Sequence, residues 1–474
     1  MKITAETQSN AEKGKIKLYP SSRSLRDLRA SAVKNLTVTG RKDGKIKMKI
    51  VEAFMILAIT AIMFVSTLSC YGIGGLQTMN KKDGGSPQSD WKYRLPIEVG
   101  TGKYERYDKP VDIQINFTEQ LKHLGVAKAF SSSSIRVAEV DPSGKLLDSA
   151  VPYQFDEAQA YDALTNASGT LVFMLKGIAP ANAKKMFHVY FDDADGSGET
   201  PTFPNQVSIA NVEEYEGDES FRIAAQNATY YYHKHGSGFA SMIDPDGNDW
   251  ISFHPTTESK DGPRGAYRGI PNIAPADFHP GRGENKLPSK IISQGPLRVR
   301  IISETKDRKW ACMWDIYPNY AAMTLLKKGE EPYWILYEGT PGGEFGLNDY
   351  WVHSSGERLS VAEYHMSKNQ WQGKLPSPKW VYFGDGNMDR VLYMILHEQH
   401  EVEDQFWHFG EGGMTVFGFG RGATREHWQQ LTAVPAHLTI GFAENGDFQA
   451  ASRIINSAYQ KLSLSVGPPE TSGK

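Results

Sequence analysis

The chain has 474 residues, more than one ordinary domain holds, and its 52 basic and 55 acidic side chains leave a net charge of -3. This balance, without a basic stripe beyond the N-terminal region, argues against a nucleic-acid partner. The only two cysteines, Cys70 and Cys312, exclude a disulfide framework, so a hydrophobic core must hold the fold together. Cys312 lies in an apolar, tryptophan-flanked stretch, where we expect a small buried side chain.

An export signal is predicted over residues 48–70. Lysines precede an apolar run at 53–69, and small residues come just before Cys70. Residues 66–70, Ser-Thr-Leu-Ser-Cys, resemble a bacterial lipobox, although the leucine stands one position closer to the cysteine than in the usual pattern. The resemblance implies that Cys70 is lipidated and that the protein is exported and anchored to the bacterial envelope, facing the periplasm or the exterior.

Two alternatives stay open in this region. The apolar run is ~16–19 residues long against the about 20 that a membrane-spanning helix needs, and an uncleaved membrane anchor is the alternative to a lipoprotein signal. Residues 1–47 are either a basic cytoplasmic leader or the product of a start site placed too early, because Met48 opens a conventional signal. Residues 71–90, rich in Gly, Ser and Lys, are predicted to be a flexible linker.

Residues 91–203 are predicted to form a small antiparallel β-sandwich. Short alternating segments recur at 91–99, 110–116, 134–140, 151–155, 169–175 and 185–191. Their order resembles a small sandwich domain of exported bacterial proteins, which implies an accessory or docking role. Asp193, Asp195 and Glu199 suit a calcium loop, but they lack its full twelve-residue pattern, and a solvated turn between domains is favoured. No cofactor is firmly indicated, and Ca2+ or another divalent cation stays an alternative.

Residues 204–466 are predicted to form a larger antiparallel β domain, followed by a disordered tail at 467–474. Strands with little helical periodicity are expected at 221–225, 229–233, 297–302, 310–317, 322–326, 333–337, 380–383, 391–396, 414–419 and 436–442. One helix is expected at 447–459. The chain is thus predicted to be all-β with few helices, a β-sandwich followed by a large supersandwich-like domain.

Residues 238–250, Gly-Phe-Ala-Ser-Met-Ile-Asp-Pro-Asp-Gly-Asn-Asp-Trp, resemble the strand–turn–strand opening of galactose-mutarotase-like supersandwich domains. A glycine, an apolar pair, an Asp-rich turn and a tryptophan follow one another in that order. Many carbohydrate-active proteins, among them polysaccharide lyases and some glycosidases, carry such a domain. The resemblance implies a poly- or oligosaccharide partner and does not select a reaction.

The stretch from residue 254 to residue 282 is the first candidate site. It lacks strand periodicity, and long loops on β scaffolds are where binding groups concentrate. Six side chains suited to binding or proton transfer lie within it: His254, Tyr267, Arg268, Asn272, His279 and the substrate-binding candidate Arg282. The alternative is a solvated loop whose arginines and histidines bind backbone carbonyl groups.

A uronic-acid lyase needs three groups, and this stretch offers each of them. Arg268 or Asn272 could neutralise the sugar carboxylate. His279 or His254 could take the C5 proton as the base, and Tyr267 could protonate the leaving oxygen.

Glu338 is the second candidate, because it ends an apolar strand beside tryptophans. An aromatic face holds a pyranose ring, and a low dielectric raises the pKa of a glycosidase acid. Trp351 and Trp407 are predicted to bind the sugar. A glycosidase needs a second carboxylate, for which the sequence offers Glu344, Asp349 and Asp315. The alternative is that Glu338 pairs with an arginine such as Arg300 across the sheet.

A third cluster at 397–408 offers possible ligands for a divalent metal ion, namely His397, His400, Glu401, Asp404 and His408. His397 and His400 are three positions apart, so they would face opposite sides of a continuing strand. The run is therefore predicted to be a solvated loop, and no metal site is assigned to it.

These features predict an exported, envelope-anchored, carbohydrate-active enzyme, with a polysaccharide lyase or a glycoside hydrolase favoured. A non-catalytic surface glycan-binding lipoprotein is the alternative from another class, and an envelope protein without a ligand is a third. The sequence contains no phosphate-binding loop, no nucleophile elbow and no dinucleotide-binding motif.

Overall fold

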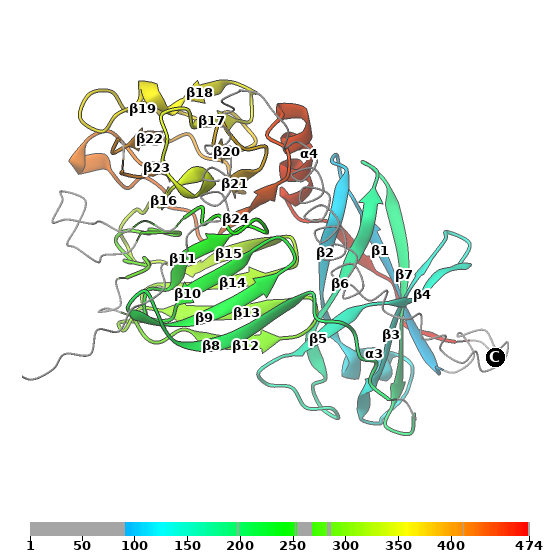
Figure 1. Cartoon of the computed structure of the whole chain (residues 1–474). Helices are drawn as coiled ribbons and strands as arrows, with labels where there is room; N and C mark the ends of the chain where they lie inside the picture. Colours follow the sequence, from blue (N-terminus) through cyan, green and yellow to red (C-terminus); the bar gives the residue numbers. More distant parts are fainter. Residues whose placement is uncertain are drawn as a thin grey trace, which may run out of the picture. The chain divides into compact units, whose positions relative to one another are not determined.

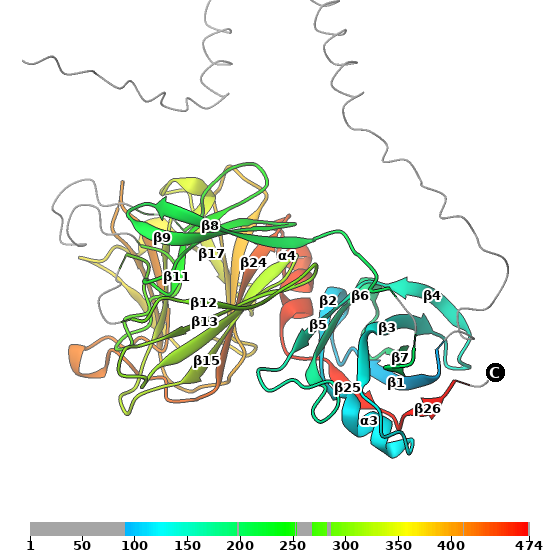
Figure 2. The same ribbon diagram turned by 90° about the horizontal axis from the view of Figure 1, so that it is seen from below.

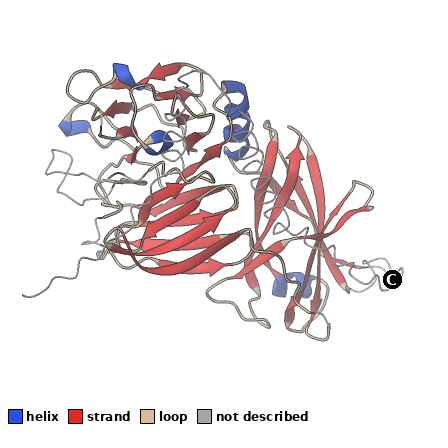
Figure 3. Cartoon of the chain, viewed as in Figure 1, coloured by secondary structure: helices blue, strands red, loops and turns tan. Residues whose placement is uncertain are grey.

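The computed structural model describes residues 91–196, 199–251, 253, 268–281, 286–410 and 412–472, which belong to one compact unit, Gly85–Lys474. Within them antiparallel strands dominate, and the two α-helices are α3 (Phe117–His123) and α4 (Phe448–Ala458) (Figure 3). The predicted all-β class is confirmed, and α4 is the predicted C-terminal helix. The predictions for residues 1–90, including lipidation of Cys70, lie outside the described residues.

The small β-sandwich consists of two sheets (Figures 1 and 2). The first contains β1 (Tyr93–Gly100), β3 (Phe130–Val140), β4 (Leu146–Val151), β7 (Lys184–Asp193), β25 (Ser463–Val466) and β26 (Glu470–Thr471). The second contains β2 (Arg106–Asn116), β5 (Tyr153–Glu157) and β6 (Ser168–Ala179). Burial alternates along β1, where Leu95, Ile97 and Val99 are fully buried and the residues between them are half-buried. Period-two alternation in the sequence therefore places one face of β1 in the core.

The end of the chain differs from the sequence-based prediction. Val466 of β25 pairs with Ile97, and Thr471 of β26 pairs with Tyr93, so the segment that follows α4 returns to the small sandwich as partners of β1. The expectation of a disordered tail from residue 467 is wrong for β26. This pairing joins residues far apart in sequence, so local composition does not reveal it.

The large domain contains one nine-stranded sheet and two four-stranded sheets (Figure 1). The nine-stranded sheet has the order β12 (Lys290–Gln294), β13 (Val299–Glu304), β14 (Ala311–Ile316), β15 (Tyr320–Lys327), β24 (Ala436–Ala443), β21 (Val391–Leu396), β20 (Trp380–Gly384), β17 (Tyr350–His353) and β18 (Arg358–Ser360). One small sheet contains β8 (Val207–Tyr215), β9 (Asp218–Ala225), β10 (Thr229–His233) and β11 (Gly238–Ile243). The other contains β16 (Ile335–Gly339), β23 (Thr415–Phe419), β22 (Asp404–His408) and β19 (Trp371–Gly373).

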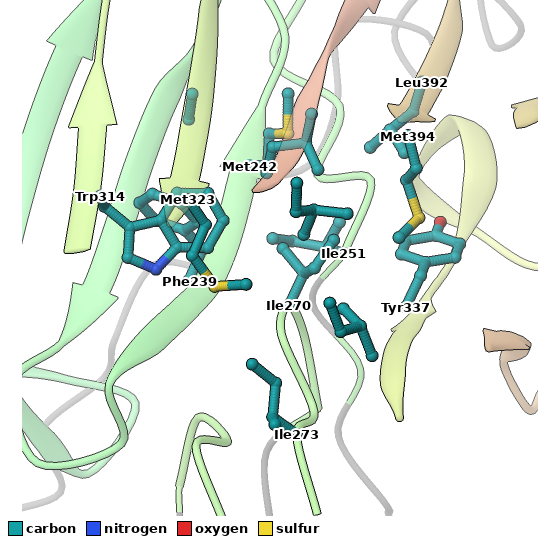
Figure 4. Close-up of a cluster of buried hydrophobic side chains, with 14 of the residues drawn as sticks. Phe239, Met242, Ile251, Ile270, Ile273, Trp314, Met323, Tyr337, Leu392 and Met394 are labelled. Atoms are coloured by element: carbon teal, nitrogen blue, oxygen red, sulfur yellow. The ribbon is translucent and has the colours of Figure 1, made fainter. Parts of the chain in front are cut away.

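One hydrophobic core draws side chains from all three sheets, so the small sheets form a layer facing the large one. Met242 comes from the first small sheet, Tyr337 from the second, and Trp314, Met323 and Met394 from the large sheet (Figure 4). Cys312 belongs to this core and is fully buried, as expected.

The segment that resembles a mutarotase-like opening forms a strand and a tight turn. Asp244 accepts hydrogen bonds from the backbone N–H groups of Asp246 and Asn248, and its second oxygen accepts one from Trp250 Nε1 at 2.9 Å. Gly247 has a φ of +90°, which glycine adopts without strain. The aspartate thus fixes both the turn and the fully buried indole of Trp250.

Arg298 joins the two sandwiches. Its side chain is fully buried, and it forms ion pairs with Asp112 of β2, at 2.6 Å, and with Asp156 of β5. Gln154 donates a hydrogen bond to the carbonyl oxygen of Arg298 at 3.0 Å. Arg106 of β2 donates to the carbonyl oxygens of Ser457 and Tyr459 at the end of α4.

No helix in the part of the chain that the structure describes has both the length and the apolarity needed to cross a membrane.

Candidate functional site

The outer face of the β16–β23–β22–β19 sheet carries the polar and aromatic side chains of the candidate site. Along β16, Ile335 and Tyr337 point into the main core, whereas Leu336 packs in a separate apolar cluster with Trp334 and Trp407 on the opposite face. Side chains alternate between the faces of a strand, so Glu338 lies on the same face as Leu336. Glu338 is also the register neighbour of Val416 on β23, which in turn neighbours Trp407 on β22.

A chain segment beside β16 brings further polar groups to Glu338. Asn272 and Leu336 exchange backbone hydrogen bonds of 3.1 and 2.9 Å, and the N–H of Glu338 donates to the carbonyl oxygen of Gly269 at 3.2 Å. A side chain at Gly269 would collide with the carbonyl oxygen of Phe239, 2.1 Å from an added Cβ. Glycine therefore permits the close approach of this segment to Phe239 of β11, with which Ile270 pairs.

Glu338 is clamped through one of its two carboxylate oxygens. Oε2 lies 2.9 Å from His279 Nε2 and accepts a hydrogen bond from Asn272 Nδ2 at 3.1 Å. The side chain keeps 9% of its surface exposed. Within the described part of the chain, no hydrogen bond reaches Oε1, so that oxygen is the one left to meet a ligand.

His279 has acceptors at both ring nitrogens. Nε2 faces the Glu338 carboxylate, and Nδ1 lies 2.6 Å from the carbonyl oxygen of Pro280, which cannot donate. A doubly protonated imidazolium satisfies both contacts. The side chain is only 2% exposed, and the backbone N–H of His279 donates to the carbonyl oxygen of Gly236 at 2.8 Å. His279 therefore acts on Glu338 and is poorly placed to take a proton from a substrate.

The surroundings keep Glu338 ionised. Desolvation pushes its pKa up, but the hydrogen bond and charge of His279, the charge of Arg268 and the hydrogen bond of Asn272 outweigh it. The pKa of Glu338 consequently lies below the usual glutamate value. This carboxylate suits a base or a nucleophile, whereas a glycosidase acid needs a raised pKa.

Next to this carboxylate, Arg421 lies among three indole rings. Its guanidinium carbon is 4.5 Å from the ring centres of Trp334 and Trp407 and 5.0 Å from that of Trp428. Nε donates to Gln405 Oε1 at 2.9 Å. Burial lowers the pKa of Arg421 to about 10, against the opposing charge of Glu338.

The structure brings together five residues that the sequence predicted for a site: Arg268, Asn272, His279, Glu338 and Trp407. The prediction for Trp351 as a sugar-binding aromatic is wrong. Its indole is fully buried in the main core between the layers and stacks on Phe406 at 5.0 Å. Three further predicted residues, His254, Tyr267 and Arg282, lie outside the described residues.

None of the three carboxylates proposed as partners for Glu338 accompanies it. Asp315 forms a two-point ion pair with Arg300, so the alternative pairing of Glu338 with Arg300 is also wrong. Asp349 is buried near Asp385, and burial raises its pKa to about 7. Its charge adds to the burial that raises the pKa of Tyr337, and the ring of Tyr337 lies on the other face of β16 from Glu338. Glu344 is exposed in the loop after β16.

The candidate metal ligands are dispersed. His397 contacts Thr439 at 2.9 Å, His400 lies 3.5 Å from Asp404, and His408 stacks on Phe345. In the loop considered for calcium, Asp193 pairs with Lys92 and Asp195 with Lys128. Among the described residues, no group of three or more His, Cys, Asp or Glu side chains is arranged to hold a metal ion.

Arg421 and Gln405 belong to this face, and the sequence reasoning missed them. Trp334 was part of the second candidate, and the structure places it in the apolar cluster of Leu336 and Trp407. Arg421 had no signal in the sequence. Its position depends on a turn in which Gly422 donates a hydrogen bond to the carbonyl oxygen of Trp428, and composition does not predict that turn.

No family model matches the sequence, and no curated protein matches it. Among solved structures, the chain is similar to a protein in glycosyl hydrolase family 38 from Enterococcus faecalis, with a TM-score of 0.44 and 11% identity over 79% of this chain and 47% of that one. It is also similar to HI1317, with a TM-score of 0.35 and 12% identity over 50% of this chain and 99% of that one. This chain therefore spans about half the length of the glycosyl hydrolase family 38 protein.

Proposed function

We propose that this chain is a carbohydrate-active enzyme whose active site is the face that carries Glu338, His279, Asn272, Arg268 and Arg421. The observation that carries the proposal is the clamp on Glu338. A buried, ionised carboxylate with one oxygen fixed by two donors and the other left free is what proton abstraction requires. Of the indole rings on this face, Trp334 and Trp407 are buried beneath Arg421, and the half-buried Trp428 is the one that offers an aromatic surface to a sugar ring.

The reaction that this arrangement favours is β-elimination at a uronic acid. Glu338 Oε1 takes the C5 proton, the electron pair forms the C4–C5 double bond, and the C4–O bond breaks. Arg268, beside Glu338, offsets the charge of the sugar carboxylate as the proton leaves. The leaving oxygen needs a proton, for which Tyr267 stays the candidate from the sequence. His279 positions Glu338 and keeps it ionised, which differs from the base role that the sequence predicted for His279.

Hydrolysis is less well supported. It requires two carboxyl groups about 5–5.5 Å apart in retaining enzymes and about 6.5–9.5 Å apart in inverting ones. Within the described residues, the groups that shift the pKa of Glu338 are His279, Arg268 and Asn272, and no carboxylate is among the largest contributors.

The experiment is a panel of acidic and neutral polysaccharides assayed in two ways. Elimination creates an unsaturated uronide that absorbs in the ultraviolet, whereas hydrolysis produces reducing ends without that absorbance. We expect ultraviolet-absorbing products and a loss of at least about 100-fold in kcat for Glu338→Gln. Glu398→Gln is the matched control, because Glu398 also pairs with a histidine, His437, at 2.6 Å but lies elsewhere.

Each remaining result identifies another function. Reducing ends without absorbance would indicate a hydrolase. Saccharide binding without turnover, unaffected by Glu338→Gln, would indicate the glycan-binding protein. Full activity of Glu338→Gln would remove the proposed site.

We also propose that the enzyme is exported and anchored through a lipid on Cys70. The support is the lysine-flanked apolar run before that cysteine. Metabolic labelling of the full chain with a fatty-acid analogue tests it, because Cys70→Ser should abolish the label. An unlabelled wild-type protein that still sediments with membranes would indicate the uncleaved anchor.

A further inference from the structure

Arg421 lies over indole rings, and these contacts use none of its hydrogen-bond donors. A guanidinium has five N–H donors in one plane, and a cation–π contact leaves them available to other acceptors. Gln405 takes the donor at Nε, and Gln405 is itself oriented by a hydrogen bond of 2.6 Å to Gln370. Within the described residues, neither terminal amino group of Arg421 has a hydrogen-bond partner, and no carboxylate forms an ion pair with it.

Arg421 has no carboxylate partner among the described residues. The negative charge of Glu338 is already paired with His279 at 2.9 Å. Desolvation lowers the pKa of Arg421, and the charge of Glu338, which raises that pKa, does not offset the desolvation. A half-buried guanidinium without a carboxylate partner binds an incoming anion strongly, because the pair forms where water competes poorly.

Two glycines shape the chain that leads into this arginine. An added Cβ at Gly418 would lie 2.3 Å from Leu336 Cδ2 and 3.0 Å from Arg421 Cβ. Gly420 has a φ of +65°, and an added Cβ there would lie 2.3 Å from the Leu431 side chain. A larger residue at position 418 or 420 would therefore collide with its neighbours. With glycine at both positions, the chain turns so that Arg421 lies over the sheet.

We propose that Arg421 is a specificity-determining residue that binds an anionic group of the sugar, a carboxylate or a sulfate ester, through its two free amino groups. The site then takes acidic glycans in preference to neutral ones. This inference rests on the proposed function for the location of the site. It adds a residue that selects acidic glycans and that the elimination step itself does not require.

Binding is measured in the Glu338→Gln variant, so that turnover does not consume the ligand. One pair of probes is oligogalacturonate and its fully methyl-esterified form, which differ in the carboxylate charge. The other pair is dextran sulfate and dextran, which differ in the sulfate ester. Calorimetric titration at one fixed ionic strength gives four dissociation constants, and the two pairs distinguish the carboxylate from the sulfate.

We expect at least one acidic probe to bind at least tenfold more tightly than its neutral counterpart. Adding Arg421→Gln should reduce that preference several-fold, with Arg268 accounting for what remains. Arg421→Lys should also lose most of it, because an ammonium cannot bind a planar acid at two points. Arg425→Gln is the control, since Arg425 is exposed and lies 6.0 Å from Trp428. It should leave the preference intact.

Three outcomes would overturn the inference: no preference for either acidic probe, an unchanged preference in Arg421→Gln, or an equal loss in Arg425→Gln. Turnover of an acidic glycan that requires Glu338 would then leave the proposed function standing. Absence of any saccharide binding or turnover would remove both. If thermal unfolding shows that Arg421→Gln does not fold, Arg421→Lys, which keeps the charge and most of the side chain, decides the question.

Discussion

His279 Nε2 lies 2.9 Å from Glu338 Oε2, although 59 positions separate the two residues in the sequence. The first residue belongs to a loop and the second to β16, so the pair forms only when the segment at 268–281 docks beside that strand. One hydrogen bond thus links the two strongest candidates found in the sequence.

Replacing His279 should shift the pH dependence of activity. The pKa of Glu338 is held down by the hydrogen bond and charge of His279 against desolvation. Without them the pKa rises, and the base is protonated at higher pH. For His279→Gln we expect the acidic limb of kcat/KM to move to higher pH, with a loss of about tenfold or more at mildly acidic pH and partial recovery at alkaline pH.

A pH–rate profile checks this prediction, with His437→Gln as the control because His437 pairs with a glutamate away from the site. A uniform loss at every pH, with an unmoved acidic limb, would mean that His279 does not set the protonation of Glu338.

Arg298 should contribute strongly to the free energy of unfolding, because it links the small sandwich to the large domain. Its fully buried guanidinium neutralises Asp112 and Asp156, and its removal leaves those carboxylates without their cation. Breaking a buried ion pair by removing one partner costs about 3–5 kcal/mol. We expect Arg298→Met to lower the free energy of unfolding by that amount in urea titrations.

The matched control for Arg298 is Lys184→Ala. Lys184 pairs with Glu98 at 2.8 Å, but 70% of its side chain is exposed, and such surface pairs contribute about 0–1 kcal/mol. Equal effects of the two substitutions would show that burial does not distinguish them.

His397 should make the fold sensitive to acid. Its Nδ1 accepts a hydrogen bond from the backbone N–H of Gln460, and Nε2 contacts Thr439, so the ring is held neutral. Desolvation, with the charges of Lys109, His437 and Lys461, lowers its pKa to about 3 from 6.5. Between these values the unfolded chain binds the proton and the folded chain does not, so stability falls as pH falls.

Each unit of such a pKa difference corresponds to about 1.4 kcal/mol. We therefore expect the wild-type protein to lose on the order of 1–3 kcal/mol between neutral pH and about pH 4 through this residue. His397→Gln should unfold with a shallower pH dependence in the same window. Parallel stability curves for the two proteins would rule out this role of His397.

The sequence predicted the fold well where the pattern is local. Alternation identified β1, and aromatic runs identified β16 and β20, because burial of one or both faces leaves a direct trace in composition. It failed at β26, whose pairing with β1 spans almost the whole domain. It also failed for Trp351, because all four residues of β17 are buried and no alternation distinguishes a core indole from a ligand-binding one.

For the site, the types of the residues indicated their chemistry, but their positions in the sequence did not show that they meet in space. Arg268, Asn272, His279 and Glu338 were proposed from their chemistry, and their convergence depends on the backbone pairing of Asn272 with Leu336. The sequence contains no trace of that pairing. The same limit applies to Arg421, which reaches Trp334 and Trp407 only through the turn that follows β23.

Gly418→Ala should disturb Arg421 without touching a charged group. The added methyl would lie 2.3 Å from Leu336 Cδ2 and 3.0 Å from Arg421 Cβ, and overpacking of this kind costs about 1–3 kcal/mol. We expect the preference for acidic oligosaccharides to fall several-fold in calorimetric titrations. Leu336→Ala in the same chain removes the closest clash, so the double variant should recover part of the preference. If Gly418→Ala and the double variant bind alike, Leu336 does not transmit the strain, and the direct contact of the added methyl with Arg421 does.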